Sequence, residues 1–395
     1  MNSLPPATVL AVVDAANLRG RASSLLRLIR SDLGILALLI SFPFMYYPKI
    51  LEGDTQLWVF AGAIFALFTF RTSRFVLHSD STMLLLAALC MLAYAMRSEL
   101  GPDLLRACYT QVAFVVFWMV CRREQGDFFP SAVRLTILIW LAVGLYQYIS
   151  VAQGLPIEIA GRFVEGRSGV PSLTPEPSIY GSLSILHMMY LLSEGQKKNN
   201  PYIVCAAASV MLSGSLFALL LLVFPLMKLR RMHLRISVLI VIPLLGIAYY
   251  LFITGGLTSR LSSFSTTESG LAGLLLDPSL NLRFGHLYFT LYKNLFDSLL
   301  LISPISFMSQ YNSFALDSGV FIETGSSFIL PAAGELIYGS GIVGALLLIL
   351  FILKARAQCT TPAKKLEKVA FIAACMLNPI SLSNMFLIMN AQQKD

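Results

Sequence analysis

Apolar runs long enough to cross a lipid bilayer constrain the fold of this chain more than any other feature. A helix needs about 20 residues to cross a hydrocarbon core of about 30 Å, and helices satisfy their own backbone hydrogen bonds there. Charged residues make up 13% of the 395 residues and hydrophobic residues 56%, which excludes an ordinary soluble domain. We therefore expect an all-α polytopic membrane protein. The runs lie at 33–47, 56–70, 82–96, 104–121, 131–152, 177–192, 201–227, 236–253, 332–353 and 369–389.

The positions of the basic residues predict how the chain is oriented. Cytoplasmic loops of membrane proteins are enriched in Lys and Arg, so the net charge of +8 does not indicate a nucleic-acid partner. With the N-terminus in the cytoplasm, nineteen of the 29 basic residues fall in segments expected to be cytoplasmic. This pattern predicts a basic cytoplasmic segment at 1–31 and a single integral-membrane domain at 32–390.

The run at 201–227 does not fit a single crossing. Basic residues lie on both sides of it, at 197–198 and 228–235, and both groups belong in the cytoplasm. A break at 213–215, Ser-Gly-Ser, would let two short helices enter the protein and return as a broken hairpin, with the turn shielded from lipid. The alternative is one long tilted helix that tolerates Gly214. With the hairpin, the chain has about eleven membrane segments.

Two long loops, at 153–176 and 254–325, are expected on the external side. Loops of this length are generally functional or disordered, and these mix aromatic, apolar and basic residues. A guanidinium group binds phosphate oxygens in pairs and stays charged. Arginines outside the cytoplasm therefore indicate an anionic ligand, although surface salt bridges are the alternative for any one of them. The external arginines include Arg162, Arg167, Arg260 and Arg283.

Glu176 lies between two prolines at the end of the first external loop. Each proline disfavours helical backbone in the residue before it, and Pro177 suits the first position of a helix. Glu176 is therefore expected at a fixed place near the outer mouth of the helical bundle, where it could act as a base. The alternative is that its charge merely complements the helix dipole.

The motif around Glu176 resembles a known family. An external loop with arginines that runs into Ser-Leu-Thr-Pro-Glu-Pro-Ser-Ile-Tyr-Gly at 172–181 is similar to the Wzy-type O-antigen and exopolysaccharide polymerases, whose broader relatives are the O-antigen ligases. The resemblance extends over about 162–353. The chain departs from the ligases because Gly214 stands where they often have Arg, and no His-Asn pair precedes the run at 332–353.

The second external loop contains a predicted amphipathic helix at 281–297. Its apolar residues are expected to lie on the bundle or the membrane surface, and its polar residues to line a cavity. An ordinary interfacial helix with solvated charges is the alternative. The apolar face comprises Phe284, Tyr288, Leu291, Leu295 and Leu299, and the polar face Arg283, His286, Thr290, Lys293 and Asp297.

The resemblance implies a GT-C-like membrane glycosyltransferase in a bacterial inner membrane, with its active site facing the periplasm. It would polymerise repeat units linked to undecaprenyl diphosphate into O-antigen or a related polysaccharide. Glu176, or in second place Glu335, would accept the proton of the attacking hydroxyl. The alternative for Glu335 is a structural role near the final external helix, and this alternative is favoured. The expected partners are the lipid-linked glycans, the bilayer and a chain-length regulator protein. The expected ligands of the diphosphate are Arg162, Arg167, Arg260, Arg283, His286 and Tyr180.

Two other functions share part of this pattern. An O-antigen ligase would use the same donor but transfer the glycan to lipid A–core. A flippase or secondary transporter would be a non-enzyme, in which broken helices are common, although two matched halves are not visible here. No metal or cofactor is expected, because the chain has no Walker A or Asp-x-Asp element and its histidines are scattered. These are His78, His187, His233 and His286.

Overall fold

The computed structural model describes residues 77–97, 128–156, 169–174, 176–230, 278–293, 307–325, 331–357 and 359–377. Within these ranges the regular elements are helices and there is no strand, which confirms the all-α prediction. The segment at 1–31 and four predicted runs, at 33–47, 56–70, 104–121 and 236–253, lie outside the described residues. The count of about eleven membrane segments therefore stays a prediction.

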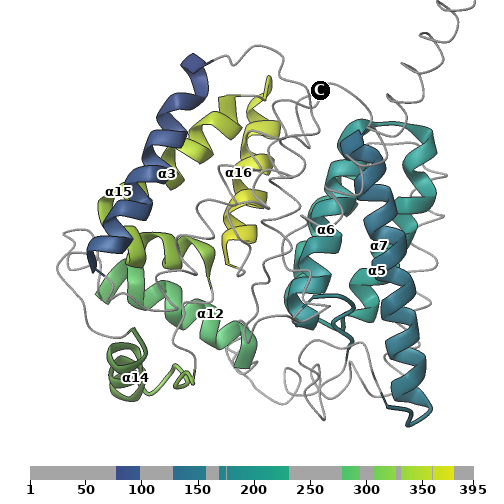
Figure 1. The fold of residues 1–395 in the computed structure, drawn as a ribbon, viewed down its shortest axis with the longest axis horizontal. Coiled ribbons are helices and arrows are strands. Elements are labelled where there is room, and N and C mark those ends of the chain that lie inside the picture. Colours follow the sequence, from purple (N-terminus) through teal and green to yellow (C-terminus); the bar gives the residue numbers. More distant parts are fainter. Residues whose placement is uncertain are drawn as a thin grey trace, which may run out of the picture.

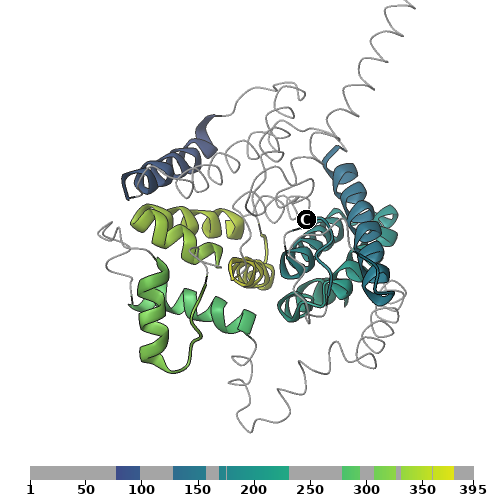
Figure 2. The ribbon, with the colours of Figure 1, turned by 60° about the horizontal axis from the view of Figure 1, so that its bottom comes forward.

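The described helices form two groups that lie side by side in both ribbon views (Figures 1 and 2). The group on the right consists of α5 (Phe128–Ala152), α6 (Pro177–Glu194), η1 (Lys197–Asn199), α7 (Asn200–Leu212), α8 (Leu216–Leu221) and α9 (Val223–Arg230). The group on the left consists of α3 (Leu77–Arg97), α12 (Pro278–Tyr288), the π-helical segment η3 (Phe289–Lys293), α14 (Phe307–Ser318), α15 (Ala332–Ala357) and α16 (Pro362–Met376).

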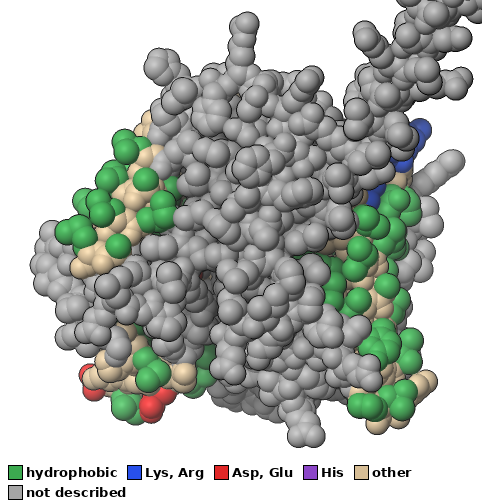
Figure 3. All heavy atoms as spheres, in the orientation of Figure 1, with side chains coloured by type: hydrophobic (Ala, Val, Ile, Leu, Met, Phe, Trp, Pro, Cys, Tyr) green, Lys and Arg blue, Asp and Glu red, His purple; other side chains and the backbone are tan. Residues whose placement is uncertain are grey.

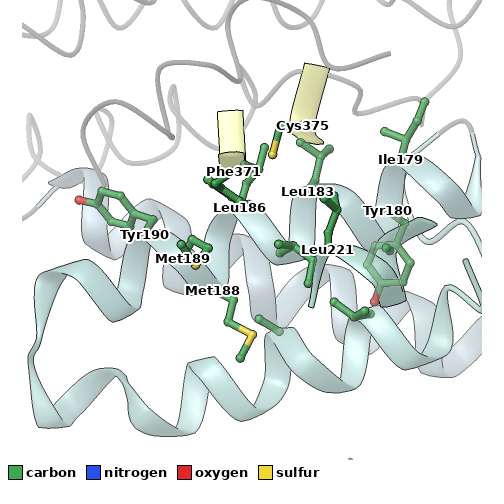
Figure 4. Packing of buried hydrophobic residues seen from close by; sticks show 14 of the residues in the cluster. Ile179, Tyr180, Leu183, Leu186, Met188, Met189, Tyr190, Leu221, Phe371 and Cys375 are labelled. Carbon is green, nitrogen blue, oxygen red and sulfur yellow. The ribbon is translucent and has the colours of Figure 1, made fainter. Parts of the chain in front are cut away.

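Helix α16 joins the two groups into one core. Figure 4 shows Phe371 and Cys375 of α16 lying close to Leu183 and Leu186 of α6. The Phe371 ring also meets the Phe224 ring of α9 edge-on, with 5.2 Å between the centroids. Large apolar side chains therefore fill the space between the groups, and the dispersion attraction among these closely packed atoms holds the groups in contact.

Two of the described helices are long and apolar enough to cross a membrane, at Pro130–Ala152 in α5 and Ala333–Ala357 in α15. Helix α5 exposes large apolar side chains such as Leu138, Leu145 and Ile149. Figure 3 shows hydrophobic side chains on the surface of α3 at the left and along α5 at the right. Such faces suit contact with lipid better than contact with water.

Helix α15 is interrupted at Gly341, so the predicted run at 332–353 is not one straight helix. Gly341 has φ 59° and ψ −139°, a backbone conformation that glycine adopts without steric cost. A Cβ on Gly344 would lie 2.2 Å from the Leu336 carbonyl oxygen, so the two halves approach closely. The straight part after Gly341 is only about 24 Å long.

Helix α16 begins at Pro362, seven residues before the predicted run at 369–389. The Thr361 side chain caps it by accepting a hydrogen bond from the Lys364 N–H, and Pro362 occupies the first helical position. The lysines expected in a cytoplasmic loop therefore lie within the helix, and Lys368 is buried. The helix therefore starts before the predicted run, and the crossing of a membrane by 369–389 stays a prediction.

The predicted break at 213–215 is confirmed. Helix α7 ends at Leu212, and Gly214 adopts a left-handed conformation with φ 54°. Ser215 then caps α8, since its side chain accepts a hydrogen bond of 3.3 Å from the Ala218 N–H.

The chain also turns back at this break. Helix α6 contacts α7, α8 and α9, while Gly181, in its first turns, lies against Ser213 and Ala218 at the break. Helix α6 is only about 27 Å long. A chain that continued straight beyond Ser213 would extend past the start of α6, and α8 and α9 could not contact it. Helices α8 and α9 therefore return along α6, as the broken hairpin requires, and the alternative of one long helix is wrong.

Candidate functional site

The two predicted external loops meet at the start of α6. Arg283 of α12 donates a hydrogen bond from Nη2 to Ser178 Oγ at 3.1 Å, although the two residues are 105 positions apart. The Ser178 hydroxyl in turn donates to Glu176 Oε2 at 3.4 Å. A guanidinium, a hydroxyl and a carboxylate therefore form one hydrogen-bonded row, which we call the Glu176–Arg283 site.

The guanidinium of Arg283 is held on a second side by the break in the hairpin. Its central carbon lies 5.2 Å from the centroid of the Phe217 ring, in α8. A cation over an aromatic face is attracted by the ring, and more strongly away from water. Arg283 is 2% exposed, so its charge acts in a poorly hydrated environment. Three elements thus fix its position: the start of α6, the break and α12.

Glu176 lies directly before α6 in extended backbone, as the flanking prolines predict. Its φ is −143° and its ψ is 149°, and Pro177 opens the helix. Thr174 Oγ1 lies 2.9 Å from the Glu176 carbonyl oxygen. The carboxylate makes no capping hydrogen bond to the helix and is half-buried. Its hydrogen bond comes instead from Ser178, the residue that also contacts Arg283.

The segment before Glu176 is clamped to α5. The Gln147 side chain donates to the Ser172 carbonyl at 2.9 Å and accepts from the Ser172 N–H at 2.7 Å. The Ser172 hydroxyl donates to the Trp140 carbonyl at 2.7 Å. Ser172 has φ 53°, which is uncommon for a residue other than glycine and is kept where the surroundings enforce it. The Val170 N–H also bonds to the Leu212 carbonyl, at the end of α7.

The predicted separation of a polar and an apolar side on the helix of the second external loop is confirmed where the structure describes it, and the cavity expected beside the polar side stays a prediction. Arg283, His286 and Thr290 are buried, while the apolar face is exposed. The alternative of solvated charges is therefore wrong for these polar residues. The structure describes the backbone of Lys293 but not its side chain, and Leu295, Asp297 and Leu299 lie outside the described residues, so these four side chains stay untested.

His286 does not bring a positive charge to the site. Its ring lies between aromatic neighbours of α14, with centroids 4.9 Å from Phe307 and 4.4 Å from Tyr311. Burial, followed by the nearby charge of Arg283, lowers the pKa of His286 to about 3. The imidazole is therefore neutral at physiological pH. The role expected of it as a diphosphate ligand could involve only a neutral hydrogen bond.

Tyr180 lies in the contact between α6 and α5. Its hydroxyl donates to the Trp140 carbonyl at 3.1 Å, and its ring meets the Trp140 ring at an angle of 64°. The side chain is fully buried there. The structure therefore places the Tyr180 hydroxyl on α5, where it packs two helices together, rather than in the Glu176–Arg283 site.

Of the four other predicted site residues, the structure describes one. Glu335 is half-buried in the first turn of α15, a helix that contacts α12 and η3. Its role as a second carboxylate stays a prediction. Arg162, Arg167 and Arg260 lie outside the described residues.

Sequence reasoning missed three residues that build the site. Ser178 was part of the quoted motif, and its place in the first turn of the helix was a usable signal. Phe217 follows the break directly, but nothing in the sequence linked it to Arg283. Gln147 lies in a predicted span, where an isolated polar residue signals a buried partner without naming it.

Among the described residues, no group of three or more His, Cys, Asp or Glu side chains is arranged to hold a metal ion. Comparisons with protein-family models, with curated proteins and with solved structures found no match. The similarity to the polymerases therefore rests on the motif at 172–181 and its neighbouring segments.

Proposed function

We propose that this chain is a membrane glycosyltransferase that polymerises oligosaccharide repeat units linked to undecaprenyl diphosphate. The product is O-antigen or a related surface polysaccharide, formed at the periplasmic face of a bacterial inner membrane by a protein of GT-C-like fold. The observation that carries the proposal is the Glu176–Arg283 site. It joins a carboxylate and a guanidinium from the two predicted external loops, next to the motif that resembles the polymerases.

The proposed reaction needs a base and a group that stabilises the leaving diphosphate. The terminal hydroxyl of the acceptor attacks the anomeric carbon of the donor sugar, and the bond from that carbon to the diphosphate oxygen breaks. Glu176 accepts the proton of the hydroxyl. Arg283 stabilises the negative charge that grows on the departing undecaprenyl diphosphate, and its poorly hydrated surroundings strengthen this effect.

Ser178 has a defined part in this proposal. It bonds to Glu176 and to Arg283 at the same time, so it sets the distance between the base and the cation. Its hydroxyl can also turn toward a phosphate oxygen when a diphosphate displaces one of these contacts. A chain without this hydroxyl should keep its fold and lose part of its rate.

The first experiment measures chain growth by purified protein in lipid vesicles, with synthetic lipid-linked repeat units as the substrate. Glu176→Gln keeps the shape of the side chain and removes the proton acceptor, so the rate should fall about 100-fold or more. Glu194→Gln is the matched control, because Glu194 is also half-buried but lies at the opposite end of α6. A Glu176→Gln rate above about a tenth of the wild-type rate would contradict catalysis by a base.

The second experiment tests the cation. Arg283→Ala should abolish long chains at an unchanged protein level, and Arg283→Lys should restore only part of the rate because an ammonium replaces a planar fork. Arg134→Ala is the control, since Arg134 bonds to Asn199 beyond the other end of α6. Full activity of Arg283→Lys would reject paired recognition of phosphate oxygens.

Interrupted helices also occur in secondary transporters, and this chain has interruptions at Gly214 and Gly341. The vesicle assay separates the two functions. When lipid-linked units are supplied to both leaflets, a transporter leaves their length unchanged, whereas a polymerase lengthens them. Absence of any lengthening by the wild-type chain would overturn the polymerase proposal.

A further inference from the structure

Helix α12 has the opposite arrangement to a helix on a water-facing surface. Phe284, Tyr288 and Leu291, spaced at helical intervals along α12 and η3, are 39%, 45% and 41% exposed. The opposite side carries polar residues that are 2% exposed or less: Arg283, His286 and Thr290. A helix between protein and water buries its apolar side and exposes its polar side. The exposed side of α12 is therefore adapted to an apolar surrounding.

This apolar side continues onto the segment around α14. The Tyr288 ring lies 6.0 Å from Phe314 and 5.8 Å from Phe321, measured between centroids, and Phe314 and Phe321 stack on each other at 5.7 Å. We call the surface formed by Phe284, Tyr288, Leu291, Phe314 and Phe321 the α12 apolar face.

Hydrogen bonds fix this face in place. Asn281 of α12 donates to the Val320 carbonyl at 3.0 Å and accepts from the Ile322 N–H at 3.0 Å, on either side of Phe321. The Tyr311 hydroxyl of α14 donates to the Ile322 carbonyl at 3.2 Å. Phe284, Tyr288 and Leu291 are thus exposed on a braced segment, beside the partly buried Phe314 and Phe321, and their exposure is a property of the folded state.

We propose that the α12 apolar face lies in the interfacial region of a lipid bilayer, with α12 resting along the membrane surface. Helix α12 has 11 residues and a length of about 16 Å, which is too short to cross a core of about 30 Å. Helix α12 and η3 contact α15, one of the two helices apolar enough to cross a membrane. A lipid surface is thus already expected beside them.

The composition of the face also favours lipid over a protein partner. Aromatic side chains are enriched where membrane and water meet, and short amphipathic helices lie there with their apolar side in the acyl boundary. Helix α14 carries a separate exposed polar row, Ser309, Ser313 and Asp317, at intervals of four residues. Figure 3 shows carboxylates beside hydrophobic side chains in this region, at the lower left. The inference holds whatever reaction the Glu176–Arg283 site performs.

The test is a measurement of collision rates at nitroxide labels on the full chain in phosphatidylcholine vesicles. Labels are attached to single cysteines in a background whose six native cysteines are replaced by alanine. At Tyr288→Cys, oxygen, which concentrates in lipid, should collide more often than a water-soluble nickel complex. Leu145→Cys on α5 is the lipid reference, and Ser313→Cys in the polar row of α14 is the control expected to favour nickel.

Two results would overturn the proposal. A label at Tyr288 that collides with nickel as often as the Ser313 label would place the face in water. A label shielded from both agents would show that protein covers it. Hydroxyl-radical oxidation of the unsubstituted chain in lipid nanodiscs is a second measurement that needs no cysteine replacement. Tyr288 should be protected there, and oxidation at the rate of a tyrosine in a peptide digest would also reject contact with lipid.

Discussion

A single methyl group at Gly181 tests how closely α6 approaches the break in the hairpin. A Cβ at this position would lie 2.4 Å from Ser213 Oγ and 2.5 Å from Ala218 Cβ, well inside ordinary contact distances. Neither atom can move far, because the Ser213 hydroxyl bonds to the Val210 carbonyl and Ala218 is held in α8. Gly181→Ala therefore forces α6 and the break apart.

The two opposing effects of this substitution differ in size. Alanine stabilises a helix by roughly 0.5–1 kcal/mol relative to glycine. Overpacking of a tight contact costs about 1–3 kcal/mol, and two overlaps with atoms held in place lie at the upper end of that range. We expect a net loss of about 2 kcal/mol in the free energy of unfolding, which would lower the melting temperature by several degrees.

The assay is the loss of helical circular dichroism on heating of the protein in lipid. Gly325→Ala is the control, since a Cβ there meets no atom within 4 Å. The double variant Gly181→Ala, Ser213→Gly removes one of the two overlapping side chains and should recover part of the loss, as expected for residues in contact. If Gly181→Ala melted at or above the wild-type temperature, α6 would not lie against the break, and the returning hairpin would be wrong.

Three further predictions follow from particular contacts. Gln147→Leu leaves the buried N–H and carbonyl of Ser172 without their side-chain partner. It should lower the free energy of unfolding by about 2–4 kcal/mol, measured by the same melting assay. An unchanged melting temperature would show that the contact between Gln147 and Ser172 does not stabilise the fold. The pKa of His286 in the folded chain is about 3, below its ordinary value of 6.5, so on acidification the unfolded chain takes up the proton first. The free energy of unfolding should therefore fall as the pH drops below about 6.5, by about 1.4 kcal/mol per pH unit. His286→Phe should melt with a smaller difference between pH 7 and pH 5 than the wild type, and equal differences would contradict burial of a neutral imidazole. Because the hairpin returns to its side of entry, cysteines at Lys198 and Lys228 should both be shielded from an impermeant thiol reagent applied outside; labelling of one alone would indicate a single crossing.

Local signals accounted for much of the fold that could be predicted. Pro177 marked the start of α6, and Ser213 with Gly214 marked the break, because proline and glycine act on the backbone directly and need no distant partner. The periodicity at 281–297 separated a polar from an apolar side correctly, since both sides arise from one helical repeat. Thr361 and Pro362 mark the start of α16 in the same way, seven residues before the predicted apolar run, so helix and apolar run do not coincide.

Contacts between distant segments were beyond the sequence. The prolines predicted that Glu176 is held in place, but only the fold shows that Ser178 links it to Arg283. Tyr180 belongs to the same motif, and its hydroxyl bonds to α5 instead. Neighbouring helix residues point in different directions, so a motif cannot tell which of them share a site.

The sequence by itself determined that the chain is helical and apolar, where its hairpin breaks, and which side of α12 is polar, because each of these follows from residues within a few turns of one another. The tertiary structure decided that the polar side of α12 is buried, with Arg283 against the start of α6 and His286 against α14, and that its apolar side is exposed. It also decided that Phe217 lies under the guanidinium of Arg283. Packing sets these relations among segments far apart in the chain, and no local pattern encodes the partner that each segment meets.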